Sequence, residues 1–170
     1  ARAASTSLTF HMSPSPDDGF AFTQRTGKRP INHLADLGVL GPETLIAHAV
    51  YLDDGELDLL IDTRTAISYC PWAYLRLGQG VSVAGRHLEF HQKNGRLALG
   101  CDTENAGDSI DAIRVGALTA GLARDMSCDP TAFGAHEALE LLTIRGAEAI
   151  GMADRVGSLE VGKAADLVVH

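Results

Sequence analysis

The sequence lacks the features that would suit it to nucleic acid or to a membrane. Among its 170 residues, 14 are Lys or Arg and 22 are Asp or Glu, which gives a formal net charge of -8 at pH 7. Nucleic acids and anionic membrane surfaces are bound by basic patches, which such an acidic chain does not favour. No apolar run approaches the roughly 18 residues that a membrane-spanning helix needs. We therefore expect neither a nucleic-acid partner nor a membrane partner.

Cysteine is also scarce, and its spacing favours neither a disulfide framework nor a local metal motif. The three cysteines, Cys70, Cys101 and Cys128, are odd in number and form no CxxC pair. This usage fits a reducing compartment, so a cytoplasmic location is expected. The opening residues, ARAASTS, show no charged segment followed by an apolar one, so no secretory signal is expected. They also include no initiator Met, which suggests a processed chain or a fragment.

The sequence does contain short apolar runs that alternate with helical patterns. Strands are predicted at Ser7–Met12, Thr44–Val50, Thr65–Cys70 and Arg96–Cys101, with a last strand at Asp166–Val169. Ser13 and Pro14 are interpreted as the N-cap and first residue of a helix or ordered loop that runs towards Gly27. Further helices are predicted over residues 31–37, 53–61 with Asp53 as its cap, 81–93, 109–124 and 135–150.

Strands that alternate with helices predict parallel βα units and an α/β fold. Four such units are half the content of a (β/α)8 barrel, which typically takes roughly 250 residues. A doubly wound open sheet is the alternative, although no GxGxxG follows a strand to support a dinucleotide-binding fold.

Polar residues lie at the ends of three predicted strands. His11 follows LTF, His48 ends LIAH, and Asp102 follows LALGC. Because parallel strands end at one edge of a sheet, two imidazoles and a carboxylate there could bind a divalent metal. Each residue also has an ordinary interpretation, since a single histidine is more often packed in the core and a single Asp more often caps a helix.

The remaining histidines do not add a second site. His33, His87, His91 and His136 are interpreted as surface residues in helices or loops. His87 and His91 are four residues apart and could share a helix face, but they lack the glutamate of an HExxH arrangement.

Several motifs resemble the amidohydrolase superfamily, in particular the aminohydrolase branch with guanine deaminase, adenosylhomocysteine deaminase and the triazine hydrolases. The most specific is ALELLTIRGAEAIGMADRVGSLEVGKAADLVV, near the end of the sequence. IAHAVYLDDGELDLL, SYCPWAYLRLGQGV, LALGCDTE and HMS resemble successive strand-end motifs of the same family. Together these matches cover nearly the whole chain in the family's order.

The resemblance implies the C-terminal half of a metal-dependent (β/α)8 TIM barrel plus part of a small β-sandwich domain. Residues 1–150 would be barrel strands five to eight with their helices, and residues 151–170 would begin the C-terminal part of the small domain. His11 matches a metal ligand, and Asp102 matches a ligand that also takes the proton of the attacking water. His48 matches a histidine that contacts this water and the substrate.

The resemblance further implies a hydrolase of C–N bonds other than peptide bonds, in a cyclic amidine, amide or N-heterocyclic substrate. One divalent metal ion, zinc or iron, would activate the water. The expected protein partner is a second copy of the chain or the missing N-terminal half of the barrel. The alternative is a catalytically impaired or non-enzymatic paralogue or fragment with the same fold.

Two departures from the family pattern put the deaminase subtype in doubt. The family's acid/base glutamate corresponds to Pro14, and the nearest carboxylates are Asp17 and Asp18. The second departure is a set of aromatic residues on the loop after the third strand, where the family usually has other residues: Tyr69, Trp72 and Tyr74. They could line a pocket for a flat heterocycle or simply pack the loop.

Overall fold

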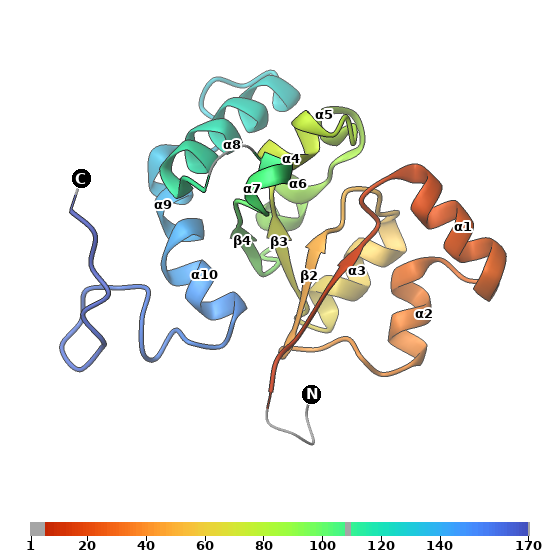
Figure 1. Ribbon diagram of the computed structural model, residues 1–170, viewed down its shortest axis with the longest axis horizontal. Coiled ribbons are helices and arrows are strands. Elements are labelled where there is room, and N and C mark those ends of the chain that lie inside the picture. The colour runs from red at the N-terminus through yellow and green to blue at the C-terminus, as the bar shows by residue number, and fades with distance from the viewer. Residues whose placement is uncertain (1–5, 108–109, 170) are drawn as a thin grey trace.

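A computed structural model describes residues 6–107 and 110–169 of the chain. Its four strands form one parallel sheet in the order β1-β2-β3-β4. The strands are β1 (Leu8–Met12), β2 (Thr44–His48), β3 (Ala66–Tyr69) and β4 (Leu97–Leu99). Figure 1 shows them at the centre of the molecule, all ending at the same edge of the sheet. The predicted α/β class with a parallel sheet is confirmed.

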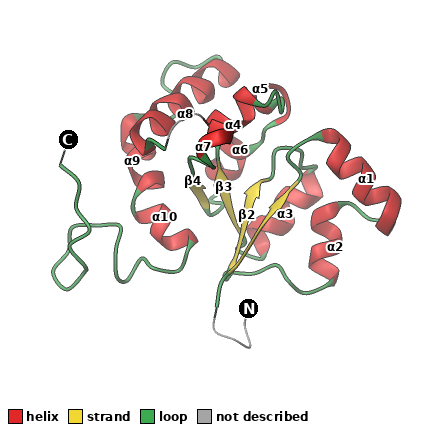
Figure 2. Cartoon of the chain, in the orientation of Figure 1, coloured by secondary structure: helices red, strands yellow, loops and turns green. Residues whose placement is uncertain are grey.

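Helices connect the strands and lie around the sheet. They are α1 (Pro16–Thr26), α2 (Pro30–Asp36), α3 (Asp54–Asp62), α4 (Pro71–Arg76), α5 (Val81–Ala84), α6 (His87–Gln92), α7 (Glu104–Gly107), α8 (Ala112–Ser127), α9 (Ala135–Leu142) and α10 (Ile144–Ala149). Figure 2 shows α1 to α3 gathered beside β1 and β2, and the later helices beside β3 and β4. Within the described parts of the chain, no helix is long and apolar enough to cross a membrane.

One face of the sheet carries the hydrophobic core. A row of apolar side chains runs in register across the four strands: Phe10, Ile46, Ile67 and Leu97. Ile46 and Ile67 are fully buried, and Leu97 is nearly so. Full burial of a side chain of this size contributes roughly 1.5–3 kcal/mol. This row therefore anchors the strands against the helices.

The next row in register lies on the opposite face and has a different character. It consists of His11, Ala47, Ser68 and Ala98. His11 is exposed, and Ala47 and Ser68 are only half-buried. Successive residues of a strand point to opposite faces, so the alternation of apolar with small or polar residues separates a packed face from an open one.

A buried carboxylate ties α2 to α3. Asp53 caps α3 as predicted, and its side chain accepts a hydrogen bond from the Glu56 amide in a capping box. Glu56 is fully buried. It is paired with the Arg29 guanidinium at 2.6 Å and accepts a hydrogen bond from the Ile31 amide. These partners compensate the cost of burying the charge.

The start of α1 differs from the prediction. The helix begins at Pro16, and its N-cap is Ser15, whose side chain accepts a hydrogen bond from the Asp18 amide. Ser13, the predicted cap, is buried, and its carbonyl accepts hydrogen bonds from the amides of Val50 and Tyr51. Tertiary contacts with the loop after β2 thus hold Ser13 and Pro14 outside the helix.

Two predicted helices are each divided in the structure. The segment 81–93 forms α5 and α6, separated at Gly85 and Arg86. The segment 135–150 forms α9 and α10, because Thr143 between them has φ -122° and ψ -97°, which is not a helical conformation. The structure also contains α4, which was not predicted; Pro71, expected only to end the strand, occupies its first turn.

The last two differences concern α8 and the C-terminal segment. Asp111 caps α8, and the helix buries Val115, Thr119 and Ala123, whereas Ile113 is about half exposed. The prediction began this helix at Ser109, which lies outside the described residues. From 150 to 169 the structure describes no helix or strand, so the predicted strand at 166–169 is not observed. Figure 1 shows this segment extending away from the helices.

Candidate functional site

His11 and His48 lie together where β1 and β2 end. The parallel register pairs Met12 with His48, which brings the two histidines to the carboxyl edge of the sheet. Their ring centroids are 4.8 Å apart, and the ring planes are tilted by 45°. The structure thus brings together two of the three predicted site residues.

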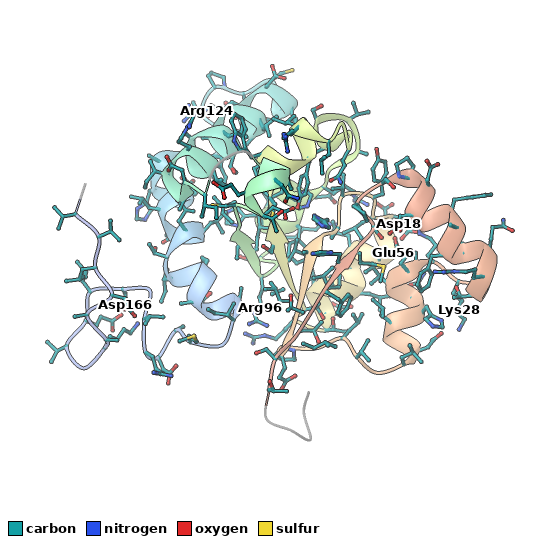
Figure 3. The ribbon with its side chains drawn as sticks, in the orientation of Figure 1. Asp18, Lys28, Glu56, Arg96, Arg124 and Asp166 are labelled. Carbon is teal, nitrogen blue, oxygen red and sulfur yellow. The ribbon has the colours of Figure 1, made fainter. Side chains whose placement is uncertain are left out.

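The surroundings of His48 favour its neutral form. Burial lowers the pKa of His48, and the charge of nearby His11 lowers it further. The carboxylates of Asp102 and Asp18 act in the opposite direction and raise it, but the net shift is downward. Both carboxylates therefore lie close enough to influence the imidazole. Figure 3 shows Asp18 at the first turn of α1.

Asp102 reaches this edge from the loop after β4. It adopts a left-handed backbone conformation with φ 61°, and its carboxylate accepts a hydrogen bond from the Thr103 amide at 2.6 Å. Gly100 permits the close approach of this loop to β3: a Cβ atom there would lie 2.7 Å from Ser68 Oγ and 2.9 Å from Cys70 Sγ. The lack of a side chain at Gly100 therefore helps to place Asp102.

The chemistry of these donors suits a divalent metal, but their number is incomplete. Imidazole nitrogen and carboxylate oxygen are ordinary ligands of zinc and iron, and the buried Nδ1 atom of His48 has no hydrogen-bond partner. A catalytic zinc site normally has three protein ligands. In the ranges 6–107 and 110–169, no group of three or more His, Cys, Asp or Glu side chains could hold a metal ion. His11 and Asp102 can thus supply only part of a coordination shell.

The predicted aromatic residues differ in their accessibility. Tyr74 is fully buried, and its hydroxyl accepts a hydrogen bond from the Cys70 amide at 2.8 Å and donates one to the Ser68 carbonyl at 3.3 Å. Tyr69 is also buried. Trp72 is half-buried on α4. Burial favours the packing interpretation for the two tyrosines, whereas Trp72 has surface left for contact with a ligand.

The sequence predicts His87 on the surface, but the structure places it in the interior. Its side chain is buried, and its Nε2 atom lies 2.6 Å from the His48 carbonyl oxygen. Its ring stacks on Tyr69 with a centroid distance of 4.2 Å. The break at Gly85 turns α6 so that His87 faces β3, and a continuous helical pattern over 81–93 does not reveal this.

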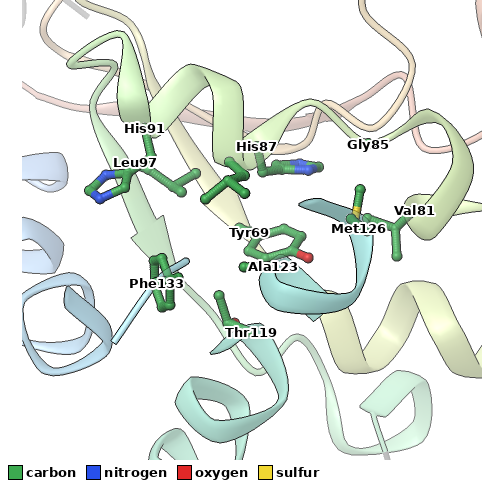
Figure 4. A pocket seen from close by; sticks show the side chains of 11 residues that line it. Tyr69, Val81, Gly85, His87, His91, Leu97, Thr119, Ala123, Met126 and Phe133 are labelled. Carbon is green, nitrogen blue, oxygen red and sulfur yellow. The ribbon is translucent and has the colours of Figure 1, made fainter. Parts of the chain in front are cut away.

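A small internal cavity lies beside this cluster, on the helix-covered side of β3 and β4. Its volume is about 20 Å³. Residues of β3, β4, α5, α6 and α8, together with Phe133, line it, as Figure 4 shows: Tyr69, Val81, His87, His91, Leu97 and Thr119 are among them. The cavity is too small for a substrate, and neither His11 nor His48 is among its lining residues.

Comparisons with known proteins identify the family of the chain. The Amidohydrolase family model matches residues 1–170, and the chain belongs to that family. It is 33% identical over 162 residues to a 5-methylthioadenosine/S-adenosylhomocysteine deaminase of Syntrophobacter fumaroxidans, covering 95% of this chain and 36% of the relative.

Two solved structures share the fold. An adenosine deaminase from Xanthomonas campestris with bound zinc matches with a TM-score of 0.92 and 27% identity, over 98% of this chain and 37% of that one. An atrazine chlorohydrolase from Arthrobacter aurescens complexed with zinc matches with a TM-score of 0.86 and 25% identity, over 97% and 36%. The chain thus spans little more than a third of the length of these proteins.

Proposed function

We propose that this chain is the C-terminal part of a metal-dependent hydrolase that cleaves C–N bonds, other than peptide bonds, in small nitrogenous molecules. The observation that carries the proposal is the meeting of His11 and His48, 4.8 Å apart, at the carboxyl edge of a parallel sheet. Reactive groups of (β/α)8 enzymes collect at this edge. The family membership of the whole chain and the deaminases among its relatives support the same chemistry.

His11 and Asp102 are the residues that would hold the metal, either zinc or iron. Such an ion would lower the pKa of a bound water to about 7. The remaining ligands would come from outside this chain, because the described residues do not complete a site. The partner needed is therefore the missing half of the barrel, or a second copy that supplies equivalent ligands.

Asp102 and His48 would share the proton chemistry. The Asp102 carboxylate takes the proton of the attacking water. His48, whose lowered pKa keeps it neutral, orients this water and stabilises charge on the substrate. Trp72 would offer a face to a flat nitrogenous ring, whereas Tyr69 and Tyr74 pack against each other with ring centroids 5.7 Å apart.

Protonation of the leaving group would use the proton that Asp102 takes from the water, and because Pro14 cannot carry it, a second carboxylate would relay it. Asp18 is a better candidate than Asp17 because its carboxylate is among the charges that shift the pKa of His48. Its position in the first turn of α1 is fixed by the hydrogen bond from its amide to Ser15. General acid–base help of this kind contributes typically 10²- to 10⁴-fold.

The alternative is a non-enzymatic or impaired member of the family. The observation in its favour is that no group of three or more potential ligands closes around a metal in the described part of the chain. The two functions differ in whether the rest of the protein supplies the remaining metal ligands.

Asp102→Asn in the full-length protein tests the proposal. An amide cannot accept the proton of water, so we expect turnover to fall by about 10²- to 10⁴-fold, while the circular dichroism spectrum and unfolding midpoint stay unchanged. Ammonia or amine release from adenosine-like and triazine substrates is the readout. Asp62→Asn, at the exposed end of α3, is the matched control. An Asp102→Asn protein with the wild-type rate would reduce Asp102 to a loop-capping role.

A further inference from the structure

The peptide after β2 is held in an unusual conformation. His48 and Ala49 have φ angles of 78° and 51°, so two successive non-glycine residues lie in the left-handed region. Such conformations are strained and persist only where surrounding contacts enforce them. The Ala49 amide is held by the Met12 carbonyl at 2.9 Å. The His48 carbonyl needs a donor on the other side of the turn.

His87 supplies that donor. Its Nε2 atom lies 2.6 Å from the His48 carbonyl oxygen. A carbonyl oxygen can only accept, so Nε2 must carry the proton, and a neutral ring then leaves Nδ1 without one. Burial lowers the pKa of His87 to about 4, which keeps the ring neutral near pH 7. The hydrogen bond therefore selects one tautomer.

Aromatic packing fixes the direction of this donor. The His87 ring stacks on Tyr69 at 4.2 Å and lies nearly parallel to Tyr74, with a centroid distance of 5.8 Å and an angle of 24°. Tyr74 also meets the edge of the His48 ring at 5.5 Å. The backbone and the ring of His48 are thus both in contact with the same aromatic cluster.

The second ring nitrogen of His87, Nδ1, forms no hydrogen bond within the described residues. This atom is buried. Gly85 leaves it room, since a Cβ atom there would lie 3.3 Å from Nδ1 and 2.5 Å from the Val81 carbonyl oxygen. The adjoining cavity of about 20 Å³ has room for one water molecule, which could occupy the free acceptor. Figure 4 shows His87 at its edge.

We propose that His87 is a positioning residue for the site: its Nε2–H group holds the strained His48 peptide so that the His48 ring faces His11. This rests on the proposed function of that site. Among the described residues, the hydrogen-bond and ring contacts of His87 are with the His48 carbonyl and the rings of Tyr69 and Tyr74, so its effect passes through the His48 backbone. A displaced reacting group can cost about 100-fold in rate, so a residue behind the site can affect turnover strongly.

Three variants of the full-length protein separate positioning from packing. His87→Phe keeps the ring but removes the donor. His87→Gln removes the ring but provides a side-chain amide N–H as a donor. His91→Phe is the matched control, because His91 lies on the same helix and lines the same cavity but makes no contact with His48 in any described interaction.

We expect His87→Phe to lower kcat by about 10- to 100-fold with little change in KM and in bound metal. His87→Gln should recover part of kcat, and His91→Phe should leave kcat within about twofold of wild type, since only the lost donor displaces His48. A kcat for His87→Phe equal to that of His91→Phe would overturn the proposal. So would a His87→Gln protein that folds normally and is no faster than His87→Phe.

Two readouts do not depend on turnover and therefore distinguish this proposal from the proposed function. Nitrogen NMR of histidine-labelled protein should show His87 protonated at Nε2 and bare at Nδ1. Hydrogen exchange of the Ala49 amide should become faster in His87→Phe and stay unchanged in His91→Phe. An Nδ1–H tautomer or unchanged exchange would overturn the positioning role, even if the protein hydrolyses C–N bonds. If the wild-type protein shows no turnover, these two measurements decide the proposal alone.

Discussion

The two faces of the sheet, formed by alternate residues of the same strands, differ in size and polarity. Phe10, Ile46, Ile67 and Leu97 on one face meet the helices. On the other face His11 is exposed, Ala47 and Ser68 are half-buried, and Ala98 is buried. The first face contributes to stability by burying apolar side chains against the helices. The second carries His11, and on it Ala66 and Ala98 pack with Ala149 of α10. His48 follows Ile46 by two residues and is buried, so the candidate site lies at the carboxyl edge, where residues of both faces meet.

The largest expected effect concerns the open face as a whole. Residues 1–170 expressed alone should aggregate or bind a hydrophobic dye, because β1 and β4 are the edge strands of the described sheet and expose backbone groups, while His11, Ala47 and Ser68 are exposed or half-buried on its second face. Size-exclusion chromatography with dye fluorescence and urea unfolding is the measurement. A monomer with a sharp, cooperative unfolding transition would contradict this comparison and favour a self-sufficient open sheet.

Neighbouring substitutions on β3 test the two faces directly in the full-length protein. Ile67→Ala should lower the free energy of unfolding by about 2–5 kcal/mol, because it opens a cavity in the packed face. Ser68→Ala should change it by less than about 1 kcal/mol, since Ser68 is half-buried and small. Urea unfolding measures both. Equal losses would show that the open face is as tightly packed as the helix-covered one.

A smaller effect is expected from His87, through pH. Its pKa is about 4 in the folded protein and 6.5 in the unfolded chain. As pH falls from 6.5 to 4, the unfolded chain takes up a proton that the folded protein does not, so stability falls. The loss attributable to this group is at most about 3 kcal/mol.

The control for this pH effect is His87→Phe, which has no group to protonate. The difference in unfolding free energy between wild type and His87→Phe should be constant above pH 7. Below pH 6.5 the wild type should lose stability relative to His87→Phe. A difference that does not vary with pH would mean that His87 has the same pKa in the folded protein as in the unfolded chain.

Much of the sheet could be predicted from the sequence because its short apolar runs are separated by clear helix signals. The meeting of His11 and His48 also follows from the sequence, since parallel strands that end in the same way must place their last residues side by side. Asp53 is recognisable as a cap because Glu56 completes a capping box three residues later.

Features set by tertiary contacts could not be predicted in this way. Ser13 has the residue type of a helix cap, but the loop after β2 uses its carbonyl. His87 looks like a surface residue until the break at Gly85 turns it towards Tyr69. The face that α8 buries depends on where the helix begins, which propensity locates only to within a few residues.

The most direct test of the central claim, that the carboxyl edge of the sheet carries part of a metal site, is an intact mass and bound-metal analysis of the natural protein. We predict a mass well above 18.0 kDa, close to one equivalent of zinc or iron, and loss of that metal in His11→Ala with the fold retained. A natural chain of 18.0 kDa without metal, or a His11→Ala protein that keeps its full metal content, would contradict the account.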